Sequence, residues 1–317
     1  MGESVRRVSR FRKLGLRRIR RLTAGTTDHE HPAWSPDGRT LAFSAGSVDS
    51  RAIYLVDRKG RFVDAVAPKG PRATRPRWAP DGRRLAFDAL PPDGPPLILI
   101  QDLPELGHDP QALVRGRRGG AGHAAFSPDG RFVAFISDDR PNAKTDGPVG
   151  MHLWLLDLES GERRQLTEES GLNDAHPAFS PDGALLAFHR YLGEHATQSS
   201  IFLLNVSTGA LMRLTDSPAF DKHPCFATPE IVIFHRESPD GAQELRAVHA
   251  LDGDEVGLQG KGPAAGLDAK QPAVRITRRG GLRVAFAGRR RDGTGLPESP
   301  RPYDLYAGAL VGLDGTA

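Results

Sequence analysis

The chain has 317 residues and a net charge of +4, with 38% hydrophobic and 26% charged residues. This composition is typical of a globular chain and excludes collagen-like and low-complexity proteins, and no apolar run approaches the roughly 18 residues of a membrane span. The single cysteine, Cys225, excludes an internal disulfide framework and any metal site built from several cysteines.

The chain begins with a basic segment, residues 1–15, which we expect to be a disordered arm. Arginine and lysine crowd into residues 1–21 although the net charge of the whole chain is small. Such an arm could contact nucleic acid or an anionic surface. Phe11 is the only aromatic residue there that could stack on a base. We therefore favour a solvated arm and expect no nucleic-acid partner.

A predicted strand at residues 18–23 follows the arm. It resembles the segments 163–167 and 211–215, which precede later copies of a repeated motif. The last segment with strand character is 304–310, and little chain follows it. We therefore expect the amino-terminal strand to complete the last sheet and to join the two ends of the chain.

The repeated motif first occurs at residues 31–43. Each of the first four copies has a Pro-Asp-Gly turn between two apolar runs, which is typical of a β-hairpin, and two further copies are eroded. The copies are about 44 to 53 residues apart, a spacing typical of propellers in which each repeat forms one blade. They begin at His31, Arg75, His123, His176, His223 and Gln271. We predict an all-β, six-bladed propeller of four-stranded antiparallel blades that occupies residues 16–317 as one domain.

Residues 32–38, Pro-Ala-Trp-Ser-Pro-Asp-Gly, are followed by Leu41-Ala42-Phe43 and by the apolar strand 53–57. This pattern resembles the TolB-type repeat, a PD40 or WD40-like propeller repeat. The resemblance implies the fold of nearly the whole chain but no single function, because such repeats serve unrelated tasks. Many TolB-like proteins are exported. No signal peptide is visible, so we expect a cytoplasmic monomer, or a periplasmic protein if the true start lies upstream.

The residue that opens each copy is the main candidate for function. In a propeller the first strand of each blade lines the central channel, so these side chains should converge there. Imidazoles suit zinc, manganese, iron or copper better than magnesium or calcium. The candidate metal ligands are His31, His123, His176 and His223. Metal affinity should fall as the pH drops through about 6, because only neutral imidazole binds a metal. The alternative is shared repeat ancestry, with each histidine bonded to the backbone of a neighbouring blade.

Other polar residues accompany the opening positions. Three carboxylates that could orient imidazoles or bind the metal are Asp28, Asp174 and Asp221. Four further candidates for contact with a bound ligand are Arg75, Gln271, His29 and Glu30. Arg75 would be placed to hold an anion beside a metal.

No phosphate-binding loop, dinucleotide fingerprint or nucleophile elbow occurs in the chain, and the sequence predicts no catalytic residue. A fainter resemblance connects the chain to oligogalacturonate lyase, a propeller whose histidines and glutamine bind a divalent metal. We interpret the chain as a binding module for a protein or a small anionic ligand, with a histidine-rich pocket that could bind a metal. The alternative is a metal-dependent lyase or hydrolase that acts on a charged saccharide-like substrate.

Overall fold

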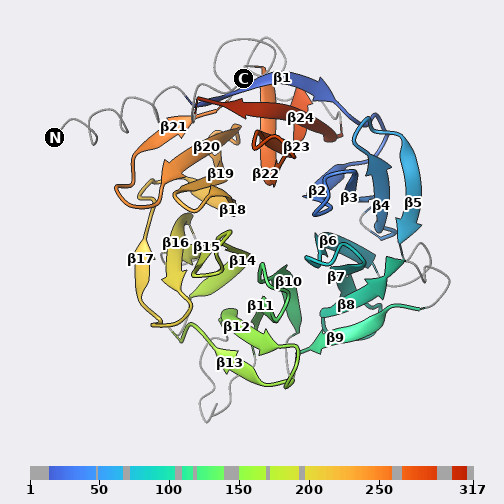
Figure 1. Ribbon diagram of the computed structural model, residues 1–317, viewed down its shortest axis with the longest axis vertical. Coiled ribbons are helices and arrows are strands. Elements are labelled where there is room, and N and C mark those ends of the chain that lie inside the picture. Colours follow the sequence, from blue (N-terminus) through green and yellow to red (C-terminus); the bar gives the residue numbers. More distant parts are fainter. Residues whose placement is uncertain are drawn as a thin grey trace.

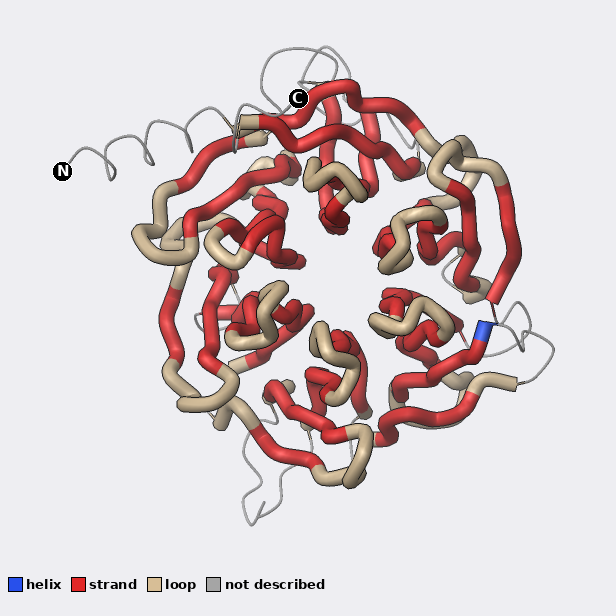
Figure 2. The backbone as a smooth tube through the Cα atoms, viewed as in Figure 1, coloured by secondary structure: helices blue, strands red, loops and turns tan. Residues whose placement is uncertain are grey.

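The computed structural model describes residues 14–47, 49–66, 72–103, 109–116, 120–138, 150–168, 172–192, 197–258, 266–290 and 302–312. Strands β1 to β24 stand as radial sheets around a central opening (Figures 1 and 2), and these residues form no α-helix. The all-β class and the propeller arrangement are therefore confirmed. None of the described segments is a helix long and apolar enough to cross a membrane. Of the predicted arm, residues 1–13 lie outside the described residues.

Four sheets each contain four antiparallel strands. The first repeat forms β2 (His29–Trp34), β3 (Thr40–Ala45), β4 (Ala52–Asp57) and β5 (Phe62–Val66). The second forms β6 (Arg72–Trp78), β7 (Arg84–Leu90), β8 (Leu97–Asp102) and β9 (Gln111–Arg115). The third forms β10 (Ala121–Phe126), β11 (Phe132–Ser137), β12 (His152–Asp157) and β13 (Arg163–Gln165). The last sheet joins β22 (Leu267–Ile276), β23 (Leu282–Arg290) and β24 (Asp304–Val311) to β1 (Gly15–Arg21).

The fourth and fifth repeats form one eight-stranded sheet. Its first half contains β14 (Asn173–Phe179), β15 (Leu185–Leu192), β16 (Gln198–Asn205) and β17 (Leu211–Arg213). Its second half contains β18 (Phe220–Thr228), β19 (Ile231–Glu237), β20 (Gln243–His249) and β21 (Glu255–Gly257). One parallel pair of residues, Ser199 and Phe220, connects β16 to β18.

An apolar triplet in the second strand of each repeat explains how neighbouring sheets pack. Its phenylalanine is fully buried in most repeats, and its middle residue is usually alanine, also fully buried. Successive side chains of a strand point to opposite faces, so the small middle residue lets the next sheet approach. Ala42 thus packs in one cluster with Leu85 and Phe87 of the following repeat.

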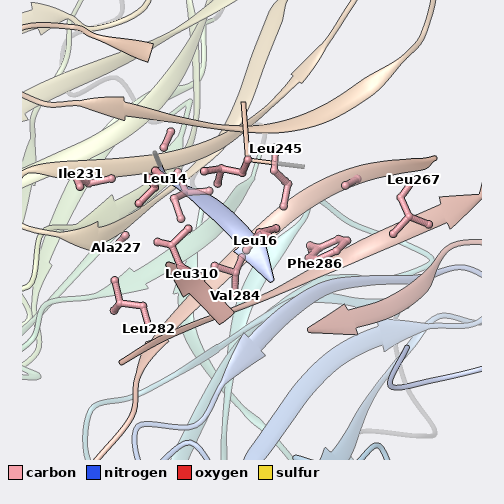
Figure 3. Packing of buried hydrophobic residues seen from close by; sticks show 14 residues of the cluster. Leu14, Leu16, Ala227, Ile231, Leu245, Leu267, Leu282, Val284, Phe286 and Leu310 are labelled. Atoms are coloured by element: carbon pink, nitrogen blue, oxygen red, sulfur yellow. The ribbon is translucent and has the colours of Figure 1, made fainter. Parts of the chain in front are cut away.

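The amino-terminal strand pairs with the last strand of the chain. In β1, Gly15 lies opposite Val311 and Arg21 opposite Tyr306, while the Leu22 amide donates to the Leu305 carbonyl at 2.7 Å. The strand begins three residues earlier than predicted because Leu14 and Leu16 are buried in an apolar cluster with Leu245 and Leu310 (Figure 3).

Candidate functional site

The six opening residues share an uncommon backbone conformation. Each has a φ between 52° and 57°, in the left-handed region that L residues rarely adopt. Each also lies at a register shift between the first two strands of its repeat. A bulge of this kind re-aims a side chain. All six side chains line one central cavity of about 730 Å³.

The four predicted histidines lie together in this cavity. The ring centroid of His176 is 3.9 Å from that of His123 and 3.8 Å from that of His223. His31 lies slightly apart, at 5.8 Å from His223 and 6.3 Å from His176. Its Nε2 is 3.0 Å from Nε2 of Gln271, and Oε1 of the same glutamine accepts a 2.9 Å bond from the His31 backbone amide. Four imidazoles and one amide therefore meet at one end of the channel.

Several opening residues are held by side chains of the preceding repeat. The His123 amide donates to Oδ1 of Asp88 at 2.8 Å, and the His176 amide donates to Nδ1 of His123 at 3.2 Å. The His223 amide donates to Nδ1 of His189 at 3.4 Å. These bonds satisfy backbone donors that the bulge removes from the strand ladder. They support a structural role for part of the histidine set.

Sequence reasoning missed two histidines of this site, His189 and His235. Both directly follow the apolar triplet of the second strand, and their rings lie 5.3 Å from His176 and 4.9 Å from His223, respectively. The Gln271 amide approaches Nδ1 of His235 at 3.4 Å. The signal was available: the position after each triplet faces the channel side, and two repeats place histidine there.

The predicted carboxylates contact other groups than the opening histidines. Asp174 accepts bonds of 2.6 and 3.0 Å from Arg190, and Asp221 accepts bonds of 2.6 and 2.7 Å from Arg236. In both cases the arginine is the cross-strand partner of the aspartate. Asp28 accepts a 2.9 Å bond from the Tyr303 amide. Because of the strand register, two of these aspartates therefore pair with arginine rather than with an imidazole.

The two remaining candidates beside His31 have different surroundings. Nδ1 of His29 lies 2.7 Å from the Thr23 hydroxyl, and its ring meets Phe43 edge-on, away from the cavity lining. Glu30 does line the cavity, where Lys270 donates to it at 2.5 Å and Arg51 forms a second ion pair. Burial alone would raise the pKa of Glu30, but these two cations lower it below its usual value.

The electrostatic environment keeps the histidines neutral. Burial lowers the pKa of His31, His123, His176 and His223 well below the ordinary value, and the Arg75 charge lowers each further. Loss of neutral imidazole therefore begins at a lower pH than the value of about 6 expected from ordinary histidines. The imidazole rings of the cavity are therefore neutral, and the charge of Arg75 beside them is positive.

Comparison with known proteins agrees with the propeller fold. No protein-family model matches the chain. The TolB protein of Francisella tularensis subsp. mediasiatica (strain FSC147) is 28% identical over 109 residues, which are 34% of this chain and 23% of that protein. The structure of putative TolB from Agrobacterium tumefaciens matches with a TM-score of 0.61 at 18% identity, over 92% of this chain and 97% of that one. The chain has a TolB-like β-propeller fold.

Another propeller of similar fold is an oligogalacturonate lyase solved in complex with manganese, with a TM-score of 0.56 and 15% identity over 92% of this chain and 93% of that one. At this identity the likeness concerns the fold. The chain spans about a quarter of the length of the curated TolB relative that it matches.

The histidines of the cavity are the candidate ligands for a metal ion. Neutral imidazoles are suitable ligands for zinc or manganese. Among the residues that the structure describes, however, no three His, Cys, Asp or Glu side chains are grouped so that they could hold a metal ion. Arg75, which pairs with Asp88 at 3.2 Å, adds positive charge to the same cavity. Neutral imidazoles and the Arg75 guanidinium therefore line the same cavity.

Proposed function

We propose that the chain is a binding module whose central cavity takes a small anionic ligand that carries a carboxylate or phosphate group. The main observation in support of this proposal is the hydrogen bonding of the Arg75 side chain. Its Nε is buried and has no hydrogen-bond partner among the described residues, although the side chain lines the cavity. A buried guanidinium nitrogen without a partner is costly, and a bound oxyanion would satisfy it.

The charge balance of the cavity supports an anion. Four lining residues are cationic: Arg51, Arg72, Arg75 and Lys222. Three of them also form ion pairs, Arg51 with Glu30, Arg75 with Asp88 and Lys222 with Glu237. The two acidic lining residues, Glu30 and Asp174, are already bonded to Lys270 and Arg190. The Nε of Arg72, like that of Arg75, is buried without a partner in the described part of the chain. Arginine forks of this kind suit planar carboxylates and phosphates.

The proposal also concerns the number of blades that surround the cavity. We propose that the eight-stranded sheet represents two blades, because only the pair Ser199 and Phe220 links its halves. The ring then has six blades, one for each repeat, and β1 closes it by completing the last blade. Six inner strands at one depth would explain why six opening residues line a single cavity.

A metal centre is the second candidate, and the short separations among the rings of His123, His176 and His223 favour it. A modest change of ring rotamers would be needed before three nitrogens could face one ion. With such an ion, the cavity could serve a metal-dependent lyase or hydrolase, and the fold of the manganese-bound oligogalacturonate lyase is similar. Arg75 would then hold the anionic group of the substrate.

We expect calorimetric titration with citrate to show binding that Arg75→Met weakens by roughly tenfold or more, the loss of a charge-assisted bidentate contact. Arg72→Met should have a similar effect. Arg83→Met is the matched control, because Arg83 is exposed in the turn between β6 and β7. Melting temperatures report whether each variant is folded.

Equal citrate affinity in wild type and in the two cavity variants would contradict the anion site. A zinc titration of untagged protein separates the second candidate. Zinc binding that survives Arg75→Met and disappears in His176→Ala would favour the metal centre over the anion site.

A further inference from the structure

A second polar site lies where the first and last repeats meet, at the turn end of the inner strands. Two adjoining cavities of about 880 and 420 Å³ share Arg58, Arg275 and Arg283 in their walls. Nine of the residues that line these cavities are basic and two are acidic. We call the two cavities together the seam groove. Residues from both ends of the chain form it.

The two acids of the seam groove, Asp37 and Asp57, offset only part of its positive charge. Asp57 accepts bonds from its neighbour Arg61 and from the Lys59 amide, at 2.6 and 2.8 Å. Asp37 accepts from the Ser35 hydroxyl and the Arg39 amide, at 2.7 and 3.0 Å. Both carboxylates are therefore occupied by the turns in which they lie.

Arg275 shows the resulting excess of positive charge. Its Nε is buried and has no hydrogen-bond partner among the residues that the structure describes. Burial lowers the pKa of Arg275, and the neighbouring charges of Arg283 and Arg58 lower it further. An anion bound in the groove would relieve this repulsion and provide the missing acceptor.

The turn of the last repeat indicates that this charge is not required by the fold. In the first repeat the Gly38 amide closes the Ser-Pro-Asp-Gly turn by donating to the Ser35 carbonyl at 2.8 Å. In the last repeat the Gly280 amide makes the same bond to Thr277 at 2.9 Å. The two residues between them are arginines, Arg278 and Arg279, in place of proline and aspartate. The turn forms with Pro-Asp or with Arg-Arg at its centre. We therefore infer that the two arginines have a role other than forming the turn.

We propose that the seam groove docks an acidic segment of a partner protein. Arginine forks bind carboxylates in bidentate pairs, and a groove of one charge sign attracts an oppositely charged chain. Ile276, which is 60% exposed beside the groove, offers an apolar contact that a polypeptide can use. Nucleic acid is less suited, because the one aromatic residue in the lining, Trp34, has the Arg275 guanidinium 4.7 Å from its ring centre.

The test uses the full chain and a fluorescein-labelled peptide of glutamate and alanine with one central leucine. The variant Arg278→Pro/Arg279→Asp restores the Pro-Asp-Gly turn of the first four repeats, so it should fold. We expect it to weaken peptide binding by about tenfold in fluorescence anisotropy, and binding to fall with added salt. Arg278→Gln/Arg279→Gln is a second variant that should weaken binding in the same direction.

The matched control is Arg83→Glu/Arg115→Gln, which removes the same net charge from exposed positions outside the groove. It should leave peptide affinity unchanged, and citrate binding at the central cavity should be unchanged in all variants. Equal weakening by the control and the turn variant would overturn the proposal, as would unchanged affinity in both turn variants. Tighter binding of oligodeoxythymidine than of the acidic peptide would instead assign the groove to nucleic acid.

Discussion

Lowering the pH from about 7 to about 5 should strongly destabilise this propeller, because the channel buries histidines that stay neutral in the folded state. Burial lowers the pKa of six of them, and for His189 the value falls to about 3. The six are His31, His123, His176, His189, His223 and His235. Positive charges of Arg75, Lys222 and Lys270 add to the effect of burial at several of these rings.

The sign follows from proton binding. In the unfolded chain each histidine takes up a proton as the pH falls below its ordinary pKa of 6.5, whereas in the folded chain it does not. The unfolded state then binds more protons, so the free energy of unfolding decreases as the pH falls from 6.5 toward the lowered folded-state values. Each such histidine contributes at most about 1.4 kcal/mol per pH unit. At pH 5, about 1.5 units below 6.5, the six together would lower the free energy of unfolding by at most roughly 12 kcal/mol, which is comparable with a typical domain stability of about 5–15 kcal/mol.

Melting temperatures measured from pH 8 to about pH 5 test this directly. The double variant His189→Gln/His235→Gln removes two of the titrating groups and should flatten the decline. Surface carboxylates such as Asp81 are a separate source of acid instability at lower pH. Burial alone would raise the pKa of Asp81, but its bonds with Arg83 and Arg84 together lower it below its usual value. A melting temperature that is constant down to pH 5 would show that the rings are not held neutral by burial.

Deletion of residues 1–23 should destabilise the whole ring by on the order of 5 kcal/mol, while deletion of 1–12 should have little effect. The longer deletion removes Leu14, Leu16 and Leu22, which are 4%, 9% and 7% exposed. It also removes the β1 pairing with β24 and the Leu22 bond to Leu305. An uncovered edge would then remain on β24.

Urea unfolding midpoints of the two truncated proteins and the full chain measure this difference. The shorter deletion is the control, since it leaves every described contact of β1 in place. Leu14→Asp/Leu16→Asp in the full chain tests the same contacts without shortening it and should also lower the midpoint. Equal midpoints for both truncations would mean that the amino-terminal strand does not hold the ring together.

The architecture could largely be predicted because the same turn sequence recurs along the chain. Pro-Asp-Gly marks the hairpin in each of the first four repeats, and the residue five positions before its proline, such as His31 or His176, is the opening residue that lines the cavity. The alternation of strand residues could also have identified His189, but only once its strand was placed beside the channel.

Pairing between side chains was less predictable, because it depends on register. Asp174 was expected beside imidazole, yet its cross-strand neighbour is Arg190, which lies 16 residues further along the chain. The left-handed φ of the opening histidines also carries no local sequence signal, because histidine, unlike glycine, does not by itself indicate that conformation. Charge excess in the seam groove arises from segments at opposite ends of the chain, which no local pattern connects.

We propose that the channel cavity binds an anion through Arg72 and Arg75. The most direct measurement is an anomalous difference map from a crystal of the untagged protein soaked in selenate. We expect a selenium peak inside the cavity, within hydrogen-bond distance of both guanidinium groups and beside the ring of His176. A map with selenium peaks on the outer surface and none in the cavity would contradict it.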